Sequence, residues 1–507
     1  MEHSREYKRR VRKRILRRRL IMGAICLVLA ATIAIGVFSC SGKTSSVFSS
    51  PAETAAATIA KIDNILLEHS GKIPAAEVEK LTAAKDALLA ACETADKTQI
   101  KAKNLVAEQE IANIKALLEK ALTQPYVVAT ASVGSAGDIL VHTPILWNAQ
   151  RSDGSFDFTN IVPQVKSYMS AFDYMSVNLE VTCGGTEAGK YDGYPAFNIP
   201  DTILDAFKSA GVDMMLTANN HAYDTGAKGM LRTVKVLKEK GIDALGTREN
   251  IADKDYIVKD INGIKIGMVC YTYENESGTA GRKSINGRLM TAEASPLIKS
   301  FNYNNLPAFY ADAANTFNEM KQDGAEAVIY YIHWGNEYQR TPNKHQKDIA
   351  QRLSDIGADV IVGGHPHVVQ PFQTLTGVNG NETVCIYSTG NFVSNQRIEA
   401  MDNQKTGHTE DGMIFGVTFQ KWSNGKITLG DVNILPTWVN LKTVSGKKVY
   451  EIAPLDTSVS DWTTFGLTGS KIDKAKASYN RTMALVGEGL NNYRTSHGMS
   501  AVQTTIE

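Results

Sequence analysis

Strand-like and helical runs alternate along the chain after Pro125, and this alternation limits the fold more than any other feature. The helical patterns include "KHQKDIAQRLSDIGA", in which Ile349, Leu353 and Ile356 fall on one face of a helix. The strand-like runs are "YVVATASV", "YMSVNLE", "VDMMLTA", "IKIGMVCYTY", "AVIYYIHW", "DVIVGG", "TVCIYSTGNF" and "MIFGVTFQ". Such alternation is typical of an α/β domain in which helices bury the strands, and functional groups are then expected where strands end.

The N-terminus combines a basic segment with an apolar one. The first nineteen residues contain ten Lys or Arg, and residues 20–38 contain no charged side chain. About twenty apolar residues span a bilayer as a helix, and a basic flank keeps its side cytoplasmic. We therefore expect a single-pass cell-membrane protein with its N-terminus in the cytoplasm and its C-terminal part outside the cell. A lipoprotein anchored at Cys40 is the alternative, because "VFSCSG" places a small residue before that cysteine and polar residues after it.

The segment between the apolar run and Pro125 is rich in Ala, Lys, Glu and Leu at helical spacing. Breaks at residues 69–74 and 93–99 predict two or three antiparallel helices. Such helices can serve as a spacer, or their apolar stripe can bind a partner. The predicted organisation is a basic cytoplasmic segment (1–19), a transmembrane anchor (20–38), a linker (39–50), a helical spacer (51–124), an α/β domain (126–455) and a C-terminal extension (456–507) with no assigned role.

The charge balance and the cysteine positions argue against nucleic-acid binding and against disulfide bonds. The 54 Lys and Arg nearly balance the 53 Asp and Glu, so nothing indicates nucleic-acid binding. Cys270 and Cys385 lie in strand-like runs, where a small buried apolar residue is the simplest reading. No disulfide is predicted.

Polar residues capable of binding metal follow five of the strand-like runs. A single carboxylate in such a place is usually a turn or cap, and a single histidine is usually structural, but five such places in strand order indicate one site. These residues are Asp138; Asn178 and Glu180; Asn219, Asn220, His221 and Asp224; His333 and Glu337; and His365 and His367.

The stretch "GGHPHVVQP" indicates a metal site most directly. In an extended segment, residues i and i+2 point to the same side, so His365 and His367 are expected to present their imidazoles together. Imidazole and carboxylate ligands suit a catalytic divalent cation, and the absence of cysteine ligands argues against a structural zinc site. Trp334 and Tyr338 can contact a polymer or fill space beneath a loop.

Six motifs in order resemble a known family: "GD" at 137–138, "NLE" at 178–180, "ANNHAYDTG" at 218–226, "HWGNEY" at 333–338, "GGHPHVVQP" at 363–371 and "YSTGNF" at 387–392. They resemble the CapA or PgsA type of capsule-synthesis protein, associated with poly-γ-glutamate. That group is similar to the calcineurin-like metallophosphoesterases. The resemblance covers about residues 127–455 and implies a metallophosphoesterase-like layered α/β/β/α sandwich.

The resemblance also implies roles for individual residues. Asp138, Glu180, Asn220, His333, His365 and His367 would be the metal ligands, and His221 would assist the leaving group as the catalytic acid. Asn178, Asn219, Asp224, Glu337 and Asn391 would contact substrate or support the ligands. Leu140 stands where the family of origin has a histidine, so one cation or two remain open, and Mn, Zn and Fe are all compatible.

Two functions follow from this interpretation. The first is a metal-dependent hydrolase that processes an anionic cell-envelope polymer such as poly-γ-glutamate. The second is a non-enzymatic polymer-binding subunit of a capsule synthesis or export complex, placed beside its partner subunits by the membrane anchor. Glu180 in place of the usual Asp, and the missing histidine at position 140, favour the second.

Overall fold

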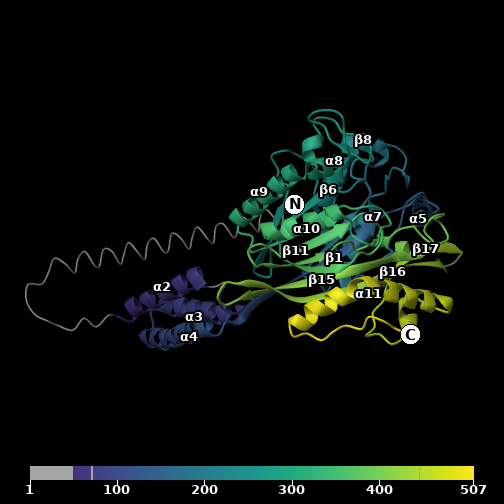
Figure 1. The fold of residues 1–507 in the computed structure, drawn as a ribbon. Helices are drawn as coiled ribbons and strands as arrows, with labels where there is room; N and C mark the ends of the chain where they lie inside the picture. The colour runs from purple at the N-terminus through teal and green to yellow at the C-terminus, as the bar shows by residue number, and fades with distance from the viewer. Residues whose placement is uncertain (1–49, 70–71, 445) are drawn as a thin grey trace, which may run out of the picture. The chain divides into compact units, whose positions relative to one another are not determined.

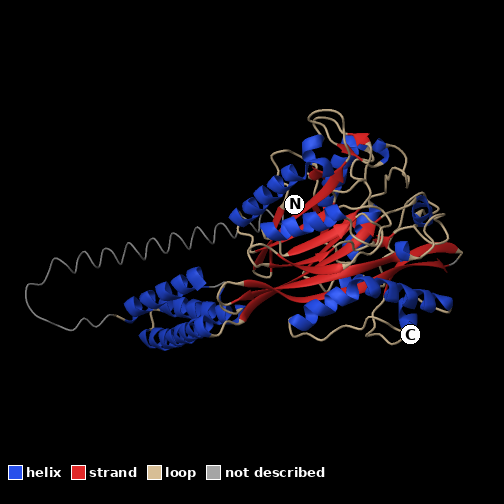
Figure 2. Ribbon diagram, in the orientation of Figure 1, coloured by secondary structure: helices blue, strands red, loops and turns tan. Residues whose placement is uncertain are grey.

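The structure is a computed structural model that describes residues 50–69, 72–444 and 446–507 (Figures 1 and 2). The predicted cytoplasmic segment, the predicted membrane anchor, Cys40 and most of the predicted linker lie outside the described residues. The described residues divide into two compact units, one formed by residues 50–62 with 83–109 and the other by residues 63–69, 72–82, 110–444 and 446–507. The boundary between the units passes through three helices.

These helices are α2 (Pro51–His69), α3 (Ala75–Thr94) and α4 (Lys97–Thr123). Their ends match the two predicted breaks. Within the first unit, Glu108 Oε1 accepts hydrogen bonds from Thr58 Oγ1 and Lys61 Nζ, both at 2.8 Å. None of the helices in the described part of the chain is both long enough and apolar enough to cross a membrane.

Two large sheets form the framework of the second unit. The first has the strand order β17-β16-β15-β1-β2-β3-β4, with β14 beside β1, and the second has the order β12-β13-β11-β10-β6-β5, with β9 beside β6. The first sheet contains β1 (Val127–Ile139), β2 (Tyr174–Leu179), β3 (Met214–Leu216), β4 (Asp243–Leu245), β14 (Asn391–Val393), β15 (Asp411–Trp422), β16 (Ile427–Val444) and β17 (Lys447–Pro454). The second contains β5 (Ile257–Ile261), β6 (Ile264–Glu274), β9 (Ser300–Asn302), β10 (Ala327–His333), β11 (Val360–Gly364), β12 (Phe372–Thr376) and β13 (Glu382–Ile386). The short strands β7 (Ser284–Ile285) and β8 (Arg288–Leu289) pair separately.

Helices cover the outer faces of both sheets, and apolar side chains fill the space between them. One apolar cluster joins inner-face residues of the two sheets, a second joins the first sheet to α7, and a third joins the second sheet to α9 and α10. The helices of these layers are α5 (Thr143–Ala149), α6 (Lys166–Met169), α7 (Thr202–Ser209), α8 (Gly226–Glu239), α9 (Leu306–Gln322) and α10 (Lys344–Ile356). The predicted α/β class is therefore confirmed, and its layers run helix, sheet, sheet, helix.

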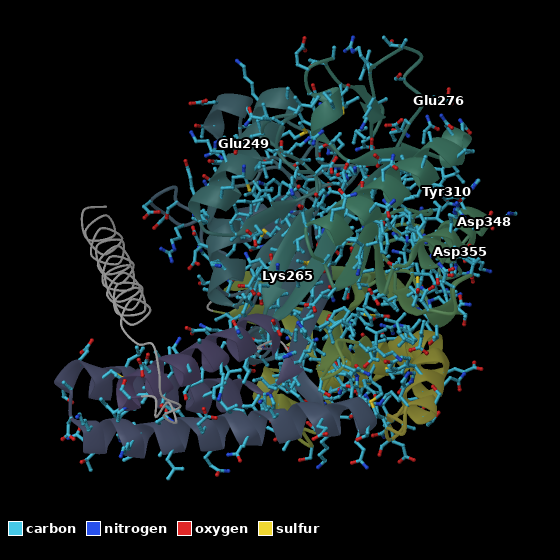
Figure 3. All side chains as sticks on the ribbon, turned by 90° about the vertical axis from the view of Figure 1, so that its left-hand side faces the viewer. Glu249, Lys265, Glu276, Tyr310, Asp348 and Asp355 are labelled. Carbon is cyan, nitrogen blue, oxygen red and sulfur yellow. The ribbon has the colours of Figure 1, made fainter. Side chains whose placement is uncertain are left out.

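Helix α10 illustrates how the sequence pattern produces these layers. Ile349 and Leu353 are fully buried against the second sheet, whereas Asp348 projects from the surface (Figure 3). The helix begins with a capping box, in which the Asn343 side chain accepts from the Gln346 N–H and the Gln346 side chain accepts from the Asn343 N–H.

The C-terminal extension completes the core of the second unit. Helix α11 (Ser470–Ser496) packs against β16 and β12 (Figure 1), and Tyr479, Met483 and Leu490 lie in the central apolar cluster. The helix predicted around residues 472–490 is confirmed, and the structure gives this segment a role in packing.

Candidate metal centre

The predicted site residues lie at the carboxyl ends of parallel strands in both sheets. In the first sheet, β1 is parallel to β2, β2 to β3, and β3 to β4. In the second, β10 is parallel to both β6 and β11, and β11 to β13. Register brings Asp138 on β1 opposite Asn178 on β2 and Asn391 on β14, and brings His333, the last residue of β10, opposite Gly364. Residues separated by more than 200 positions are thereby gathered at one edge.

Buried carboxylates and amides form the part of the site contributed by the first sheet. Asn178 Nδ2 donates to Asp138 Oδ1 at 2.7 Å and to Glu180 Oε2 at 3.2 Å. Asn219 Nδ2 donates to Asn178 Oδ1 at 3.1 Å and to the Leu179 carbonyl at 2.8 Å. Asn178 therefore orients both carboxylates, and Asn219 orients Asn178.

Three histidines form the part contributed by the second sheet. His333 Nε2 lies 2.8 Å from Asn220 Oδ1 and 3.5 Å from Glu180 Oε1, so it faces the first sheet. His367 Nδ1 lies 3.2 Å from Asp138 Oδ2, and its Nε2 lies 3.6 Å from Glu180 Oε1. The ring centroid of His365 lies 4.8 Å from that of His333 and 5.8 Å from that of His367.

The backbone of the histidine pair differs from the prediction. We expected an extended segment, but His365 has φ 96° and His367 has φ 57°, both in the left-handed region. The imidazoles still converge, because a sharp turn after β11 directs them to the site in place of the alternation of a strand. Just before this turn, Gly363 lets the end of β11 lie close to the backbone of Tyr387, since a Cβ there would lie 2.0 Å from the Tyr387 carbonyl oxygen.

Burial and neighbouring charges shift the pKa values of the site residues in different directions. Burial raises the pKa of Glu180 well above its usual range, and the Asp138 carboxylate adds to this rise. Burial lowers the pKa of His333 to about 3 and that of His365 well below its usual range. For His367, burial favours a lower pKa, but Glu180 and Asp138 outweigh it and raise the pKa to about 9. Burial also favours a higher pKa for Asp138, yet its hydrogen bond to His367 holds the pKa below the usual range.

The donor set fits a divalent cation. Ligand atoms lie within 4.8 Å of one another in three groups: Glu180 with His333 and His365; Asp138 with Glu180 and His367; and Glu337 with His365 and His367. Glu180 Oε1 and His365 Nδ1 are buried and accept or donate no hydrogen bond among the described residues. Such unsatisfied buried atoms are costly unless another group binds them. Imidazole nitrogens with carboxylate and amide oxygens suit Mn, Zn or Fe, and the groups can hold one cation or two neighbouring ones.

His221 forms a separate acid–base pair beside these ligands. Its Nδ1 lies 2.8 Å from Asp224 Oδ2, and the same carboxylate oxygen accepts from the Phe197 N–H at 2.8 Å. The Phe197 ring packs edge-on against the imidazole, with centroids 4.7 Å apart. Asp224 and Phe197 thus fix the ring of His221 and leave its Nε2 for chemistry. Sequence reasoning did not single out Phe197.

The remaining predicted residues differ in burial: Asn391 and Trp334 are buried, and Glu337 is exposed. Asn391 is fully buried, and its Nδ2 donates to the carbonyls of His367 and Thr409 and to Gln396 Oε1, so it braces the loop that bears His367. Trp334 is also fully buried and donates to the Tyr387 carbonyl at 2.9 Å, so contact between Trp334 and a polymer is excluded. Glu337, in contrast, is exposed at the outer side of the histidines.

Two neighbours of the site were missed in the sequence. The Tyr273 ring lies 4.9 Å from that of His365, and His142 accepts from the Asn395 N–H at 3.2 Å. Burial lowers the pKa of His142 to about 4. Tyr273 is the penultimate residue of β6, so its position at the end of a buried strand could have identified it. His142 follows the "GD" motif by four residues and offered no comparable signal.

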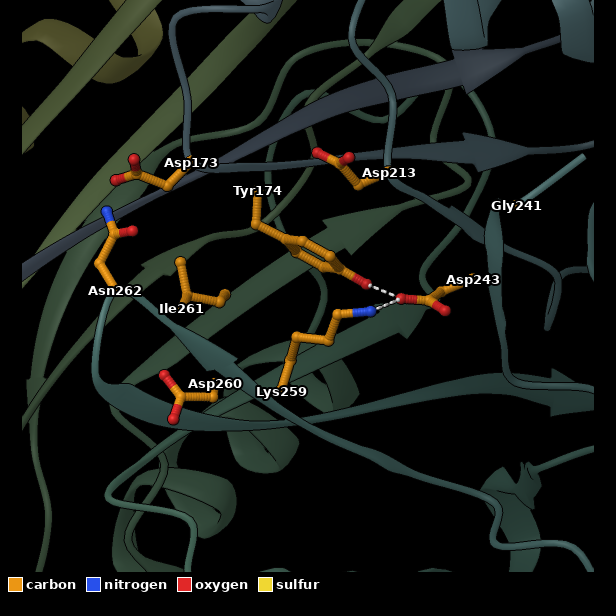
Figure 4. A pocket seen from close by; sticks show the side chains of 9 residues that line it. All are labelled: Asp173, Tyr174, Asp213, Gly241, Asp243, Lys259, Asp260, Ile261 and Asn262. Carbon is orange, nitrogen blue, oxygen red and sulfur yellow. Dashed lines mark hydrogen bonds and ion pairs between the residues drawn. The ribbon is translucent and has the colours of Figure 1, made fainter. Parts of the chain in front are cut away.

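A separate hollow of about 300 Å³ lies near the amino ends of β2, β3 and β4 (Figure 4). Asp243, one of the aspartates that line it, is already paired: one oxygen accepts from the Tyr174 hydroxyl and from Lys259 Nζ, both at 2.6 Å. This hollow lies at the opposite strand ends from the metal-binding groups, so it belongs to a different part of the unit.

Comparison with known proteins identifies the family. The model of the family described as bacterial capsule synthesis protein PGA_cap matches residues 132–396, just over half of the chain and every predicted site residue. The chain is 30% identical over 264 residues to the capsule biosynthesis protein CapA of Bacillus anthracis, covering 51% of this chain and 59% of that protein. It is 32% identical over 195 residues to the PGA biosynthesis protein CapA of Bacillus subtilis (strain 168), covering 38% of this chain and 45% of that protein. The chain thus spans about half the length of these relatives. It belongs to the family of bacterial capsule synthesis proteins.

Proposed function

We propose that this chain is a membrane-anchored extracellular protein of capsule synthesis that acts as a metal-dependent hydrolase on an anionic envelope polymer. The observation that carries the proposal is the convergence of buried carboxylate, amide and imidazole groups from both sheets at one edge. The layered arrangement of helices and sheets, with ligands at the carboxyl ends of strands, supports the likeness to calcineurin-like metallophosphoesterases.

The proposed chemistry assigns a task to each group. Asp138, Glu180, Asn220, His333, His365 and His367 hold the cation or cations. A bound divalent cation lowers the pKa of a water molecule and polarises the bond under attack. His221 donates a proton from Nε2 to the leaving group, and Asp224 keeps the ring in the orientation and tautomer that this step requires.

The substrate proposal depends on the relatives. Two CapA proteins, described as acting in capsule and PGA biosynthesis, share the region that contains the site. Poly-γ-glutamate or another anionic envelope polymer is therefore the proposed substrate class. The apolar run at residues 20–38 would place the site outside the cell, and partner subunits of a capsule complex would lie in the same membrane.

Metal analysis combined with turnover tests the proposal. The purified full-length chain should contain Mn, Zn or Fe by elemental analysis and should hydrolyse poly-γ-glutamate or a generic phosphodiester when that metal is supplied. His365→Ala should lose metal, whereas His221→Ala should keep metal and lose turnover. Wild-type protein that contains the metal and turns over neither substrate would contradict the enzymatic proposal.

A non-enzymatic, polymer-binding role is the second candidate, and one observation favours it. Leu140 occupies the position of a usual histidine ligand, and its side chain is buried in an apolar cluster at 2% exposure. Under this alternative, the protein binds polymer with equal affinity in wild type and His221→Ala, and neither protein shortens the polymer chain.

The orientation has its own test. A protease added to intact cells should cleave within residues 50–507 and leave the N-terminal segment protected. Complete protection of residues 50–507 would contradict the proposed extracellular location.

A further inference from the structure

The two groups of ligands that share Glu180 differ in the number of protein ligands that they can offer to a cation. One contains Glu180, His333 and His365, with Asn220 Oδ1 2.8 Å from His333 Nε2, so it can offer four protein ligands. The other contains Asp138, Glu180 and His367 and offers three. Its expected fourth member would come from position 140, but the Leu140 side chain is buried in the apolar cluster on the outer face of the first sheet.

Glu337 lies beside one histidine of each group. Its carboxylate oxygen is within 4.8 Å of ligand nitrogens of both His365 and His367. Unlike the other ligands, Glu337 is exposed, so it approaches the site from the solvent side.

The backbone around Glu337 is held in place. The Tyr338 N–H donates to the Pro366 carbonyl at 2.7 Å, which ties the loop to the residue between the two histidines. On the other side, the Gly335 N–H donates to the Tyr303 hydroxyl at 2.8 Å. Tyr338 has φ 64°, in the left-handed region, which a non-glycine residue adopts when surrounding contacts fix it. The loop is therefore preorganised to present Glu337 to the histidine pair.

Charge balance agrees with this position. Two divalent cations carry four positive charges, and Asp138 and Glu180 supply only two negative charges from the buried part of the site. A third carboxylate reduces the excess while it adds an oxygen ligand of the kind that Mn²⁺ and Fe²⁺ accept.

We propose that Glu337 is a direct ligand of the cation held by Asp138, Glu180 and His367, and that it replaces the histidine missing at position 140. This inference rests on the proposed metal centre, but not on the reaction that the centre performs.

Metal binding by the full-length chain tests this role without any activity assay. Mn²⁺ is titrated by calorimetry into chelator-treated wild type, Glu337→Gln and Glu337→His, and retained Mn²⁺ is then measured by elemental analysis. We expect two binding events in wild type, and in Glu337→Gln the affinity of one event falls roughly 10- to 100-fold while the other is unchanged. Glu337→His should restore most of this loss, because an imidazole can take the ligand position. Glu293→Gln, which removes an exposed carboxylate from another loop, is the matched control and should bind as wild type.

A double variant assigns Glu337 to one cation. If Glu337 and Asp138 bind the same cation, Asp138→Asn/Glu337→Gln should bind Mn²⁺ within about twofold of Asp138→Asn alone. Equal Mn²⁺ stoichiometry and affinity in wild type and Glu337→Gln would overturn the inference, whatever the enzyme does. Loss of one binding event in Glu337→Gln, with no turnover of any substrate by wild type, would support the inference and contradict only the hydrolase proposal.

Discussion

Tyr338 and both members of the histidine pair occupy a backbone region that side chains usually avoid. Tyr338, His365 and His367 all have positive φ, and all three belong to two loops joined by the Tyr338–Pro366 hydrogen bond. Such strain persists where surrounding structure enforces it, and it concentrates at functional sites. Here it directs two imidazoles and one carboxylate, which come from two separate loops, into the same space.

Asp224 should matter to turnover and not to metal content. Asp224→Asn replaces the carboxylate that orients His221, so we expect turnover to fall roughly 10²- to 10⁴-fold, the range of general acid–base contributions. Metal content by elemental analysis should stay at the wild-type value, because Asp224 belongs to none of the ligand groups. Full activity in Asp224→Asn would exclude this pair from the reaction. Asp402→Asn, at an exposed loop position, serves as the control.

Asp359 should make stability depend on pH. Burial raises the pKa of Asp359 from 3.8 to about 6, although its carboxylate accepts from the Val328 N–H at 2.7 Å. A raised pKa means that the folded protein favours the protonated acid. The free energy of unfolding of the wild type is therefore highest below about pH 4 and decreases as the pH rises from there through about 6. Asp359→Asn lacks the charge and should avoid this loss.

The expected gain follows from the same shift. Each pKa unit corresponds to about 1.4 kcal/mol, and partial solvent access reduces the effect, so Asp359→Asn should exceed wild type by about 1–2 kcal/mol at pH 8. The difference should vanish near pH 4 in urea unfolding. A difference that does not change with pH would refute the role assigned to the Asp359 charge.

At the level of helices and strands, the elements with strong periodicity were predictable. Seven of the eight strand-like runs each correspond to one strand, and the helix predicted at residues 344–358 occurs as α10, because each carries a clear apolar pattern. The eighth run, "TVCIYSTGNF", instead divides into β13 and the start of β14, which belong to different sheets. Strands β4, β9 and β14 have only three residues each, which is too short for a period to appear. The strands β16 and β17 were not predicted. The first half of β16 is half-buried and shows no regular alternation of apolar and polar residues, so only its pairing with β15 defines it as a strand.

The candidate site could be predicted in part for a related reason. Its main residues follow strands, so order along the chain and residue type were sufficient to identify them. The sequence placed Glu337 among the metal-capable residues, but neither its proposed ligand position nor the contact of Phe197 with His221 could be assigned, because both depend on turns whose direction the sequence does not specify. The left-handed backbone conformation of His365 could likewise not be predicted from the sequence, because Pro366 is compatible with an extended chain.

The N-terminus of α10 gives a prediction for an element. Asn343→Ala removes the acceptor of the Gln346 N–H, and loss of such a cap costs about 1 kcal/mol of unfolding free energy. Gln346 also donates to Gln370 Oε1 at 2.8 Å, so part of the cap is buried and the loss should appear in guanidinium unfolding. Asn343→Asp keeps an acceptor and should remain within a few tenths of a kcal/mol of wild type. An equal loss in both variants would assign the effect to something other than the cap.

At the level of the whole α/β unit, the metal-binding groups join the two sheets at the carboxyl ends of their parallel strands. Asp138, Asn220 and Glu180 come from the first sheet, and His333, His365 and His367 come from the second. A bound cation would therefore connect the sheets directly. It would also offset the repulsion and desolvation of acids and imidazoles that have fewer hydrogen bonds than they need.

Metal removal should consequently destabilise the folded unit as a whole. A ligand at about 100 times its Kd stabilises the folded state by about 2.7 kcal/mol, so chelator treatment should lower the Tm by several degrees, and Mn²⁺ should restore it. Hydrogen exchange should slow on Mn²⁺ addition at the carboxyl ends of both β1 and β10, because the cation holds both sheets. His333→Ala and His365→Ala should remove the response of the Tm to Mn²⁺. Slower exchange confined to one sheet would mean that the cation is held by that sheet alone, and the two halves of the site would then act independently.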